Sequence, residues 1–421
     1  MGRRVELEFK PPFILVKSQT FSALFDRLAR YRIVGVFGWS SIILIPAIAA
    51  MGLFLLLLSL QALLSRPEVQ AAQREAGPQS LLLIPGLNPY LPILYGWLGL
   101  VVALLFHEGA HGVLARLLGY NVKSSGLILF IVLPIGAFVE TDEEEMKKGR
   151  GRDVVRILAG GPASNMVIAL LSLGLLVWAT SGLQPTTMIT VEEVISNSPA
   201  EAAGLRPGDI IASVNGRPVT SLSVLAEAIN AAGYGGSISL EVMRSGVGVL
   251  RLTVGVAELG AGRPMIGVKL ANAEMQQWAS DYLERYKSAS LANPLIYLLP
   301  PTFPNSLHPF SEAQICTDST APSPRCFTVS GLYTHPILGN SYPVIANMLY
   351  WIWFVNFNVG IFNALPIYPL DGGQIFRRTL STFFGSRIGE QGVRAATIAV
   401  SLALVGLVLS LFMIPYLAPL A

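Results

Sequence analysis

The chain has 421 residues, of which 52% are hydrophobic and only 13% are charged, and its mean hydropathy is +0.56. Because ordinary soluble domains carry about 25% charged residues, this composition excludes a typical soluble enzyme and indicates that lipid is the main solvent. The net charge of +3 is small and dispersed, with no basic patch interleaved with aromatic residues, so we expect no nucleic-acid partner. The first ten residues lack an apolar core, so we expect no secretory signal peptide.

Five apolar stretches are long enough to cross about 30 Å of hydrocarbon, which takes roughly 20 helical residues. They are residues 33–64, 91–118, 154–180, 345–367 and 395–417. Residues 121–140 are also apolar but are interrupted by glycine and proline, which favours a membrane-dipping hairpin covered by protein. The sequence therefore predicts a mostly α-helical, polytopic transmembrane bundle.

Lysine and arginine are distributed unevenly among the connecting segments. Residues 1–32 contain seven of them and residues 119–153 contain five, whereas residues 66–90 contain two. Since cytoplasmic loops carry the excess of positive charge, we expect a cytoplasmic N-terminal segment over 1–32 and an additional transmembrane helix over 33–65. The same alternation predicts that the long interval between the third and fourth spans is extracytoplasmic.

The second span contains the run His107-Glu108-Gly109-Ala110-His111, which fits the HExxH pattern. Histidines four residues apart lie on one face of a helix, where both imidazoles can bind one zinc ion, and the glutamate between them can act as general base. Ionisable groups inside a span are costly unless they are paired or metal-bound. Chance occurrence, with the histidines merely buried, is therefore the less favoured interpretation.

A catalytic zinc ion takes a third protein ligand and keeps a fourth position open. His308 and His335 lie in the predicted external interval, away from this site. Asp371 is the better candidate, because it closes the fourth span, and the orientation above places it in the same inner half of the bilayer as the HExxH run. Taken alone, an aspartate in a turn rich in proline and glycine is more often a capping residue.

Two motifs together resemble a known family. HEGAH in one span, followed by N-A-L-P-I-Y-P-L-D-G-G at residues 363–373, is similar to the paired signature of the site-2 protease family of intramembrane metalloproteases. The chain matches every fixed position of HExxH and of N-x-x-P-x-x-x-L-D-G. The resemblance implies that His107, His111 and Asp371 bind one zinc ion and that Glu108 activates water.

The resemblance also implies a set of supporting residues. The run G-P-A-S-N, from Gly161 to Asn165, is like the family's G-x-x-x-N segment, and its small residues would let helices approach closely. Asn165 either donates a hydrogen bond to the substrate backbone or oxyanion, or joins two helices as a polar contact. Asn363 and Pro366 are expected to support the site, with Asn363 orienting it.

Residues 187–258 differ in character, because short alternating segments replace the long apolar runs. The order A-G-L-x-P-G-D-x-I-x-x-x-N-G at residues 203–216 resembles PDZ domains of bacterial type, which implies a small α+β domain inserted into the bundle. Such folds typically take an extended peptide as an added strand on a sheet edge. A steric plug or size filter that binds no peptide is an alternative of equal weight.

Residues 259–344 form a further extracytoplasmic insert with proline-rich stretches and two cysteines, Cys316 and Cys326. In an extracytoplasmic compartment a disulfide between them is expected, with two free thiols as the alternative. The insert does not specify a function, and we expect His308 and His335 to be surface or packing residues.

These features predict an intramembrane zinc metalloendopeptidase whose membrane core comprises residues 91–180 and 345–421. Its substrates would be membrane proteins that are cut in or near a transmembrane segment. The resemblance to the family implies a role in regulated intramembrane proteolysis, in which the substrate has first been cut elsewhere. One alternative is a catalytically silent scaffold that binds peptides through the PDZ-like domain, although the ligand set is intact. The other is a transporter that relays ions through its histidine and acidic residues, although no inverted repeat is evident.

Overall fold

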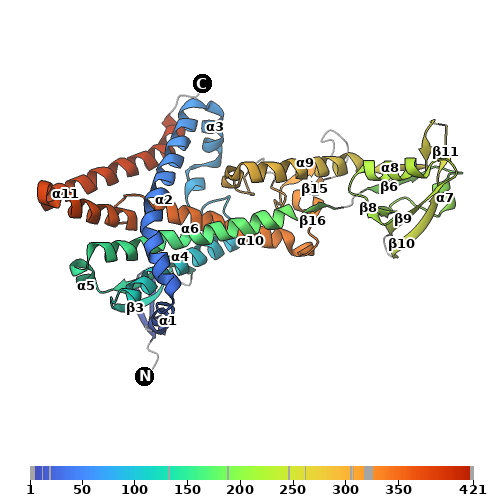
Figure 1. Ribbon diagram of the computed structural model, residues 1–421. Coiled ribbons are helices and arrows are strands. Elements are labelled where there is room, and N and C mark those ends of the chain that lie inside the picture. Colours follow the sequence, from blue (N-terminus) through green and yellow to red (C-terminus); the bar gives the residue numbers. More distant parts are fainter. Residues whose placement is uncertain are drawn as a thin grey trace. The chain divides into compact units, whose positions relative to one another are not determined.

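The computed structural model describes residues 5–417 apart from positions 12, 19, 131–132, 187–188, 245–246, 261, 304–305, 307 and 317–325. The chain forms two compact units, one of Met1–Gly174 with Met348–Ala421 and the other of Leu175–Asn347. Long helices dominate the first unit, whereas the second combines a larger sheet with shorter helices (Figure 1).

Five helices among the described residues are long and apolar enough to cross a membrane. They are α2 (Arg32–Ser65), α4 (Ile93–Leu117), α6 (Gly151–Ser181), α10 (Tyr342–Ala364) and α11 (Asp371–Leu417). Each corresponds to one of the five predicted spans, so the prediction of a mostly helical, polytopic fold is confirmed. Between α2 and α4 the chain forms α3 (Pro67–Ala76) and a short 3-10 turn, η1 (Pro78–Leu81).

The first spanning helix, α2, is attached to the core through a buried arginine. The guanidinium carbon of Arg156 on α6 lies 4.6 Å from the centroid of the Trp39 ring on α2. Such cation–π contacts contribute about 0.5–2 kcal/mol. One residue earlier on α2, a Cβ added to Gly38 would lie 2.8 Å from the Leu114 side chain, so glycine permits close packing of α2 against α4.

The predicted hairpin over 121–140 is present as β3 (Val122–Phe130) and β4 (Leu133–Thr141). The N-terminal segment, which we had assigned only to a side of the membrane, adds β1 (Val5–Lys10) and β2 (Phe13–Ser18) to give a sheet in the order β1-β2-β3-β4. The alternation of V-E-L-E-F-K is a strand signal that could have predicted the added hairpin. In the chain, helix α1 (Thr20–Leu28) follows β2, and helix α5 (Glu143–Lys148) follows β4.

The structure corrects the predicted location of Asp371. The residue does not close the fourth span, because α10 ends at Ala364 and Asp371 is the first residue of α11. Pro366 lies in the connecting turn, and proline ends a helix because it lacks an N–H and crowds the preceding turn. Gly372 lets α11 begin against this turn, since an added Cβ would clash with the backbone oxygen of Ala364.

Helix α11 is also longer than the predicted fifth span, and it changes direction within its length (Figure 1). At Gly389 the backbone has φ 69° and ψ 174°, which is not helical. The second arm contains the predicted span, whereas the first arm carries exposed aromatic residues, Phe383 and Phe384, among arginines. The first arm was missed because its mixed composition is not a continuous apolar run.

The second unit contains an antiparallel sheet in the order β10-β9-β7-β6-β13, with β8 paired to β7. Asn215 and Gly216 have φ of 51° and 76° and form the tight turn between β7 and β8 that the N-G dipeptide predicts. The sheet extends past residue 258, because its last strand lies in the region that we had assigned to the insert. The bounds are β6 (Thr190–Val194), β7 (Ile210–Val214), β8 (Arg217–Pro218), β9 (Ser237–Arg244), β10 (Gly248–Gly255) and β13 (Val268–Ala271), with helices α7 (Pro199–Ala202) and α8 (Leu222–Ala232).

Buried apolar residues of the strands pack against α8. Ile189, Ile211, Leu225 and Leu240 are buried in one cluster, which gives the sheet a hydrophobic core of its own. The second unit also contains two short strand pairs, β11 (Ala257–Glu258) with β12 (Pro264–Met265) and β5 (Gln184–Pro185) with β16 (Tyr333–Thr334).

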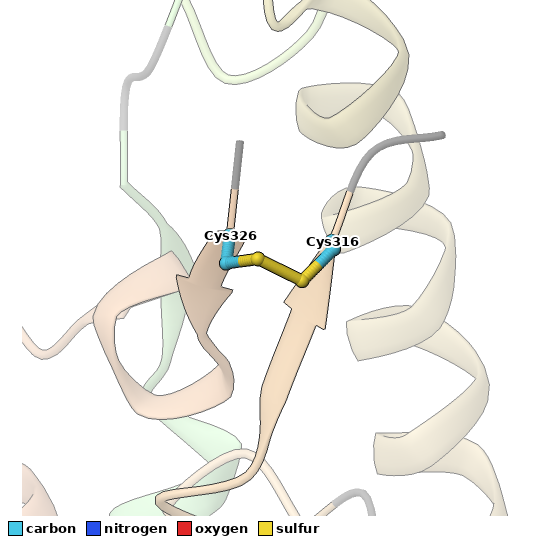
Figure 2. The surroundings of a disulfide bond; sticks show 2 residues. All are labelled: Cys316 and Cys326. Atoms are coloured by element: carbon cyan, nitrogen blue, oxygen red, sulfur yellow. A yellow bond between two sulfur atoms is a disulfide. The ribbon is translucent and has the colours of Figure 1, made fainter. Parts of the chain in front are cut away.

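Residues after β13 form α9 (Ala273–Ala292), the 3-10 turns η2 (Pro294–Leu298), η3 (Val329–Leu332) and η4 (Gly339–Ser341), and a small ladder. In that ladder β14 (Gln314–Cys316) pairs with β15 (Cys326–Thr328), and the two cysteines lie directly opposite each other. Figure 2 shows the disulfide that joins Cys316 to Cys326.

Candidate metal centre

His107 and His111 lie one turn apart on α4 and direct their ring nitrogens toward the first residue of α11. The Nε2 atoms of His107 and His111 are 3.0 and 3.3 Å from Oδ2 of Asp371. The potential ligand atoms of the three residues all lie within 4.8 Å of one another. His107 is 6% exposed and Asp371 is 9% exposed, so the cluster lies inside the protein. Helices distant in sequence therefore bring the three predicted ligands together.

The spacing of this cluster fits a zinc ion. Zinc–nitrogen and zinc–oxygen bonds of about 2.0–2.2 Å in a tetrahedral site place neighbouring ligand atoms about 3.3 Å apart. The two histidine–aspartate separations are close to this value. Apart from the two imidazoles, the buried Oδ2 atom of Asp371 has no hydrogen-bond partner among the described residues. Since buried polar atoms are nearly always satisfied, this oxygen is suited to bind a cation.

Gly161 on α6 keeps the space beside the two imidazoles free. A Cβ added at this position would lie 2.5 Å from Nε2 of His111 and 2.7 Å from Nε2 of His107. The sequence suggested that Gly161 allows helices to pack closely, but any side chain here would enter the space into which both nitrogens point. Glycine is thus required by the geometry of the site itself.

Glu108 lies between the two histidines in sequence and is half-buried. Its Oε2 atom accepts a hydrogen bond of 3.0 Å from the backbone N–H of Val139 on β4. The sheet hairpin therefore fixes the carboxylate of the residue that directly follows His107. A carboxylate in this place can take up and release a proton, as a general base must.

The outer nitrogen of each imidazole has a defined partner on α6. Nδ1 of His111 lies 2.8 Å from the backbone oxygen of Ile157, and Nδ1 of His107 lies 3.1 Å from the amide nitrogen of Asn165. Asn165 is fully buried, so it contacts the cluster from behind His107. The contribution of Ile157 was missed, and no side-chain pattern could have indicated it, because its backbone oxygen makes the contact.

The two remaining supporting residues lie at the end of α10 and in the turn after it. Asn363 donates a hydrogen bond of 3.0 Å to the backbone oxygen of Val359 within α10, so its amide nitrogen is bonded inside its own helix. The turn around Pro366 is held from α11, because the backbone N–H of Tyr368 donates to the hydroxyl of Ser401 at 3.0 Å. This second contact fixes the turn that leads into Asp371.

His308 and His335 belong to the second unit and are packing residues there, each 3% exposed. Nδ1 of His308 lies 2.8 Å from the Tyr286 hydroxyl, and its Nε2 lies 2.9 Å from the backbone oxygen of Leu299. Burial lowers the pKa of His308 to about 4, although the bond to Leu299 acts in the opposite direction. Nδ1 of His335 accepts two backbone N–H bonds, so both side chains are occupied structurally.

Similarity to known proteins agrees with this geometry. A sequence model of Peptidase family M50 matches residues 95–408. The uncharacterized protein MJ0971 of Methanocaldococcus jannaschii is 34% identical over 205 residues, which cover 48% of this chain and 52% of that protein. The chain thus spans about half the length of this relative.

Two further relatives differ in how much of the chain they match. A Clostridium perfringens protein named "Putative zinc metalloprotease CPE1693" is 24% identical over 340 residues, or 75% of this chain and 95% of that protein. Periplasmic serine endoprotease DegP of Salmonella typhimurium is similar over a short stretch, with 39% identity over 56 residues, 13% of this chain and 12% of the relative. Because the matched family model covers most of the chain, including the HExxH run and the L-D-G motif, the chain belongs to Peptidase family M50, the site-2 protease family, and is a multi-pass membrane protein.

Proposed function

We propose that the chain is an intramembrane zinc metalloendopeptidase that hydrolyses peptide bonds in or near the transmembrane segments of other membrane proteins. The observation that carries this proposal is the convergence of His107, His111 and Asp371 on one buried point, and Glu108 directly follows His107 on the same helix. All four residues lie on helices long and apolar enough to cross a membrane.

Each residue has a defined task in this proposal. The two Nε2 atoms and the Asp371 carboxylate would hold zinc, and zinc supplies Lewis acidity that lowers the pKa of water toward neutrality and polarises a carbonyl. Glu108 takes the proton of the attacking water and passes it to the leaving amine. Its bond to the Val139 N–H keeps the carboxylate in place for both transfers.

The substrate must present an accessible backbone. A helical segment hides its carbonyl oxygens in its own hydrogen bonds, so a transmembrane substrate has to unwind locally before it can be cut. By family membership we propose a role in regulated intramembrane proteolysis, in which the substrate has first been shortened elsewhere. The N-terminus would be cytoplasmic and the second unit extracytoplasmic, as the loop charges favour.

We propose that the sheet formed by β6 to β13 is a PDZ-like peptide-binding domain. The run at 203–216 contains β7, with α7 directly before it and β8 and α8 after it, and β13 is a terminal strand of the sheet path. A terminal strand offers backbone groups to an added peptide strand. The second candidate function of this sheet is a size filter that excludes large substrates without binding peptides. A variant that no longer binds peptides but keeps full cleavage specificity would favour this alternative.

Replacement of Glu108 by glutamine tests the catalytic proposal. The change removes the base but keeps the shape and all three ligands, so zinc content should be unchanged while cleavage of a membrane-embedded reporter falls by about 10²–10⁴-fold. Glu75→Gln, at an exposed position on α3, is the matched control and should behave as wild type.

The same measurements separate the alternatives. Wild-type protein that holds zinc but does not cut the reporter, while still binding peptides, would support the scaffold function. Ion flux in reconstituted vesicles that depends on Glu108, without cleavage, would support the transporter. Cleavage unaffected by Glu108→Gln contradicts the proposed mechanism.

A further inference from the structure

The contact between His107 and Asn165 raises a question of hydrogen-bond balance. A neutral imidazole has one nitrogen that donates and one that accepts. With the Asn165 amide nitrogen facing Nδ1 of His107 at 3.1 Å, Nδ1 has to accept, and the proton then lies on Nε2. In that arrangement Nε2 has no lone pair to offer to a metal, although it is one of the atoms that converge on Asp371.

His111 shows the arrangement that metal binding requires. Its Nδ1 lies 2.8 Å from the backbone oxygen of Ile157, and an oxygen can only accept. Nδ1 of His111 therefore carries the proton, which leaves a lone pair on Nε2. Metal-ligating histidines almost always donate their other N–H to a carbonyl or carboxylate in this way.

The amide oxygen and nitrogen of Asn165 can exchange places without moving the side chain, so either atom can face His107. With the nitrogen toward His107, the amide oxygen of Asn165 is buried and has no hydrogen-bond partner among the described residues. With the oxygen toward His107, Oδ1 accepts the Nδ1 proton and is satisfied. Nε2 of His107 then has the same free lone pair as Nε2 of His111.

We propose that Asn165 is a positioning residue, whose Oδ1 accepts the Nδ1–H of His107 and so holds this imidazole in the tautomer that can bind zinc. Asn165 on α6 and the Ile157 carbonyl two turns earlier on the same helix would thus perform one task for the two histidines of α4. The inference rests on the proposed zinc site. It gives Asn165 the task of orienting the metal ligand His107, and not of binding substrate or of joining helices alone.

Three variants of the full-length protein in lipid nanodiscs test this assignment by the zinc dissociation constant, measured in competition with a chromophoric chelator. Asn165→Leu removes the acceptor at similar volume and should weaken zinc binding by about 10–100-fold. Asn165→Asp keeps an acceptor oxygen and should bind zinc at least as tightly as wild type. Asn358→Leu is the matched control, since Asn358 is a polar residue of α10 whose amide donates to the Phe354 backbone oxygen, and it should leave zinc affinity unchanged.

The outcomes separate this inference from the proposed function. A wild-type protein that binds no zinc contradicts both. If wild type and Asn165→Leu bind zinc with equal affinity, the positioning role of Asn165 is overturned, but the proposed protease function is not. Should Asn165→Leu not fold, Asn165→Asp decides, because a loss of zinc affinity of tenfold or more in that variant also overturns the proposal.

Discussion

The molecule contains two pairs of largely buried histidines, and they differ in what surrounds their nitrogens. In the membrane unit, Nε2 of His107 and of His111 both point to one carboxylate oxygen of Asp371. In the second unit, His308 has a separate protein partner for each nitrogen, and Nδ1 of His335 accepts backbone N–H bonds. Burial alone therefore does not mark a metal site, whereas convergence of several ligand atoms on one point does.

The two glycines that face these histidines extend the comparison. Gly161 lies against Nε2 of both His107 and His111, and Gly182 lies against Nε2 of His335, where an added Cβ would be 2.5 Å away. The steric conflict is similar in the two places, but the expected consequences differ. One glycine keeps a metal-binding space free, and the other permits packing of a structural side chain.

The largest effect is expected for Gly161→Ala. The new methyl group would lie 2.5 and 2.7 Å from the two Nε2 atoms and would displace the imidazoles from their metal-binding positions, so zinc affinity should fall by at least about 100-fold. Zinc titration of the purified protein measures this directly. Gly182→Ala is the matched control and should lower thermal stability without changing zinc affinity. Equal zinc affinity for Gly161→Ala and wild type would contradict the claim that Gly161 keeps the metal-binding space free.

A smaller effect is expected from acid on the second unit. Burial lowers the pKa of His308 to about 4, whereas an unfolded histidine titrates near 6.5. Between these values the unfolded state binds a proton that the folded state does not, so stability falls as the pH is lowered through this window. The loss attributable to His308 should approach about 3 kcal/mol at pH 4.

His308→Gln should remove most of this acid sensitivity. Hydrogen–deuterium exchange of α9, corrected for the intrinsic effect of pH on exchange, provides a local measurement between pH 7 and 4. Tyr286, which contacts His308, lies on this helix. If the variant retains the full acid-induced loss of protection, His308 is not the responsible group.

The metal-binding residues could be predicted from sequence because their chemistry depends on residue type and short spacing. HExxH defines one helical face, and Asp371 stands in a recognisable motif. The roles of Gly161, Ile157 and Val139 could not be read in this way, since they depend on absent side chains or on backbone groups brought close by tertiary packing. Sequence indicated Asn165 but not the ligand that it contacts.

The membrane spans were predictable for a similar reason, because length and hydropathy suffice to define a crossing helix. Shorter elements were predicted less well. The sheet gained β1 and β2 from a segment assigned only by charge, and the first arm of α11 escaped a search for apolar runs. Strand β13 lies outside the expected domain because its partner β6 is distant in sequence. Long-range pairing of this kind leaves little local signal.

X-ray absorption spectroscopy at the zinc edge, combined with metal content per chain, tests the central claim most directly. Wild-type protein should contain about one zinc ion, bound by two imidazole nitrogens and carboxylate oxygen at about 2.0–2.2 Å. Asp371→Ala should lose the metal or replace the oxygen ligand. Wild-type protein without zinc, or with coordination that Asp371→Ala leaves unchanged, would contradict the assignment of His107, His111 and Asp371 as the metal ligands.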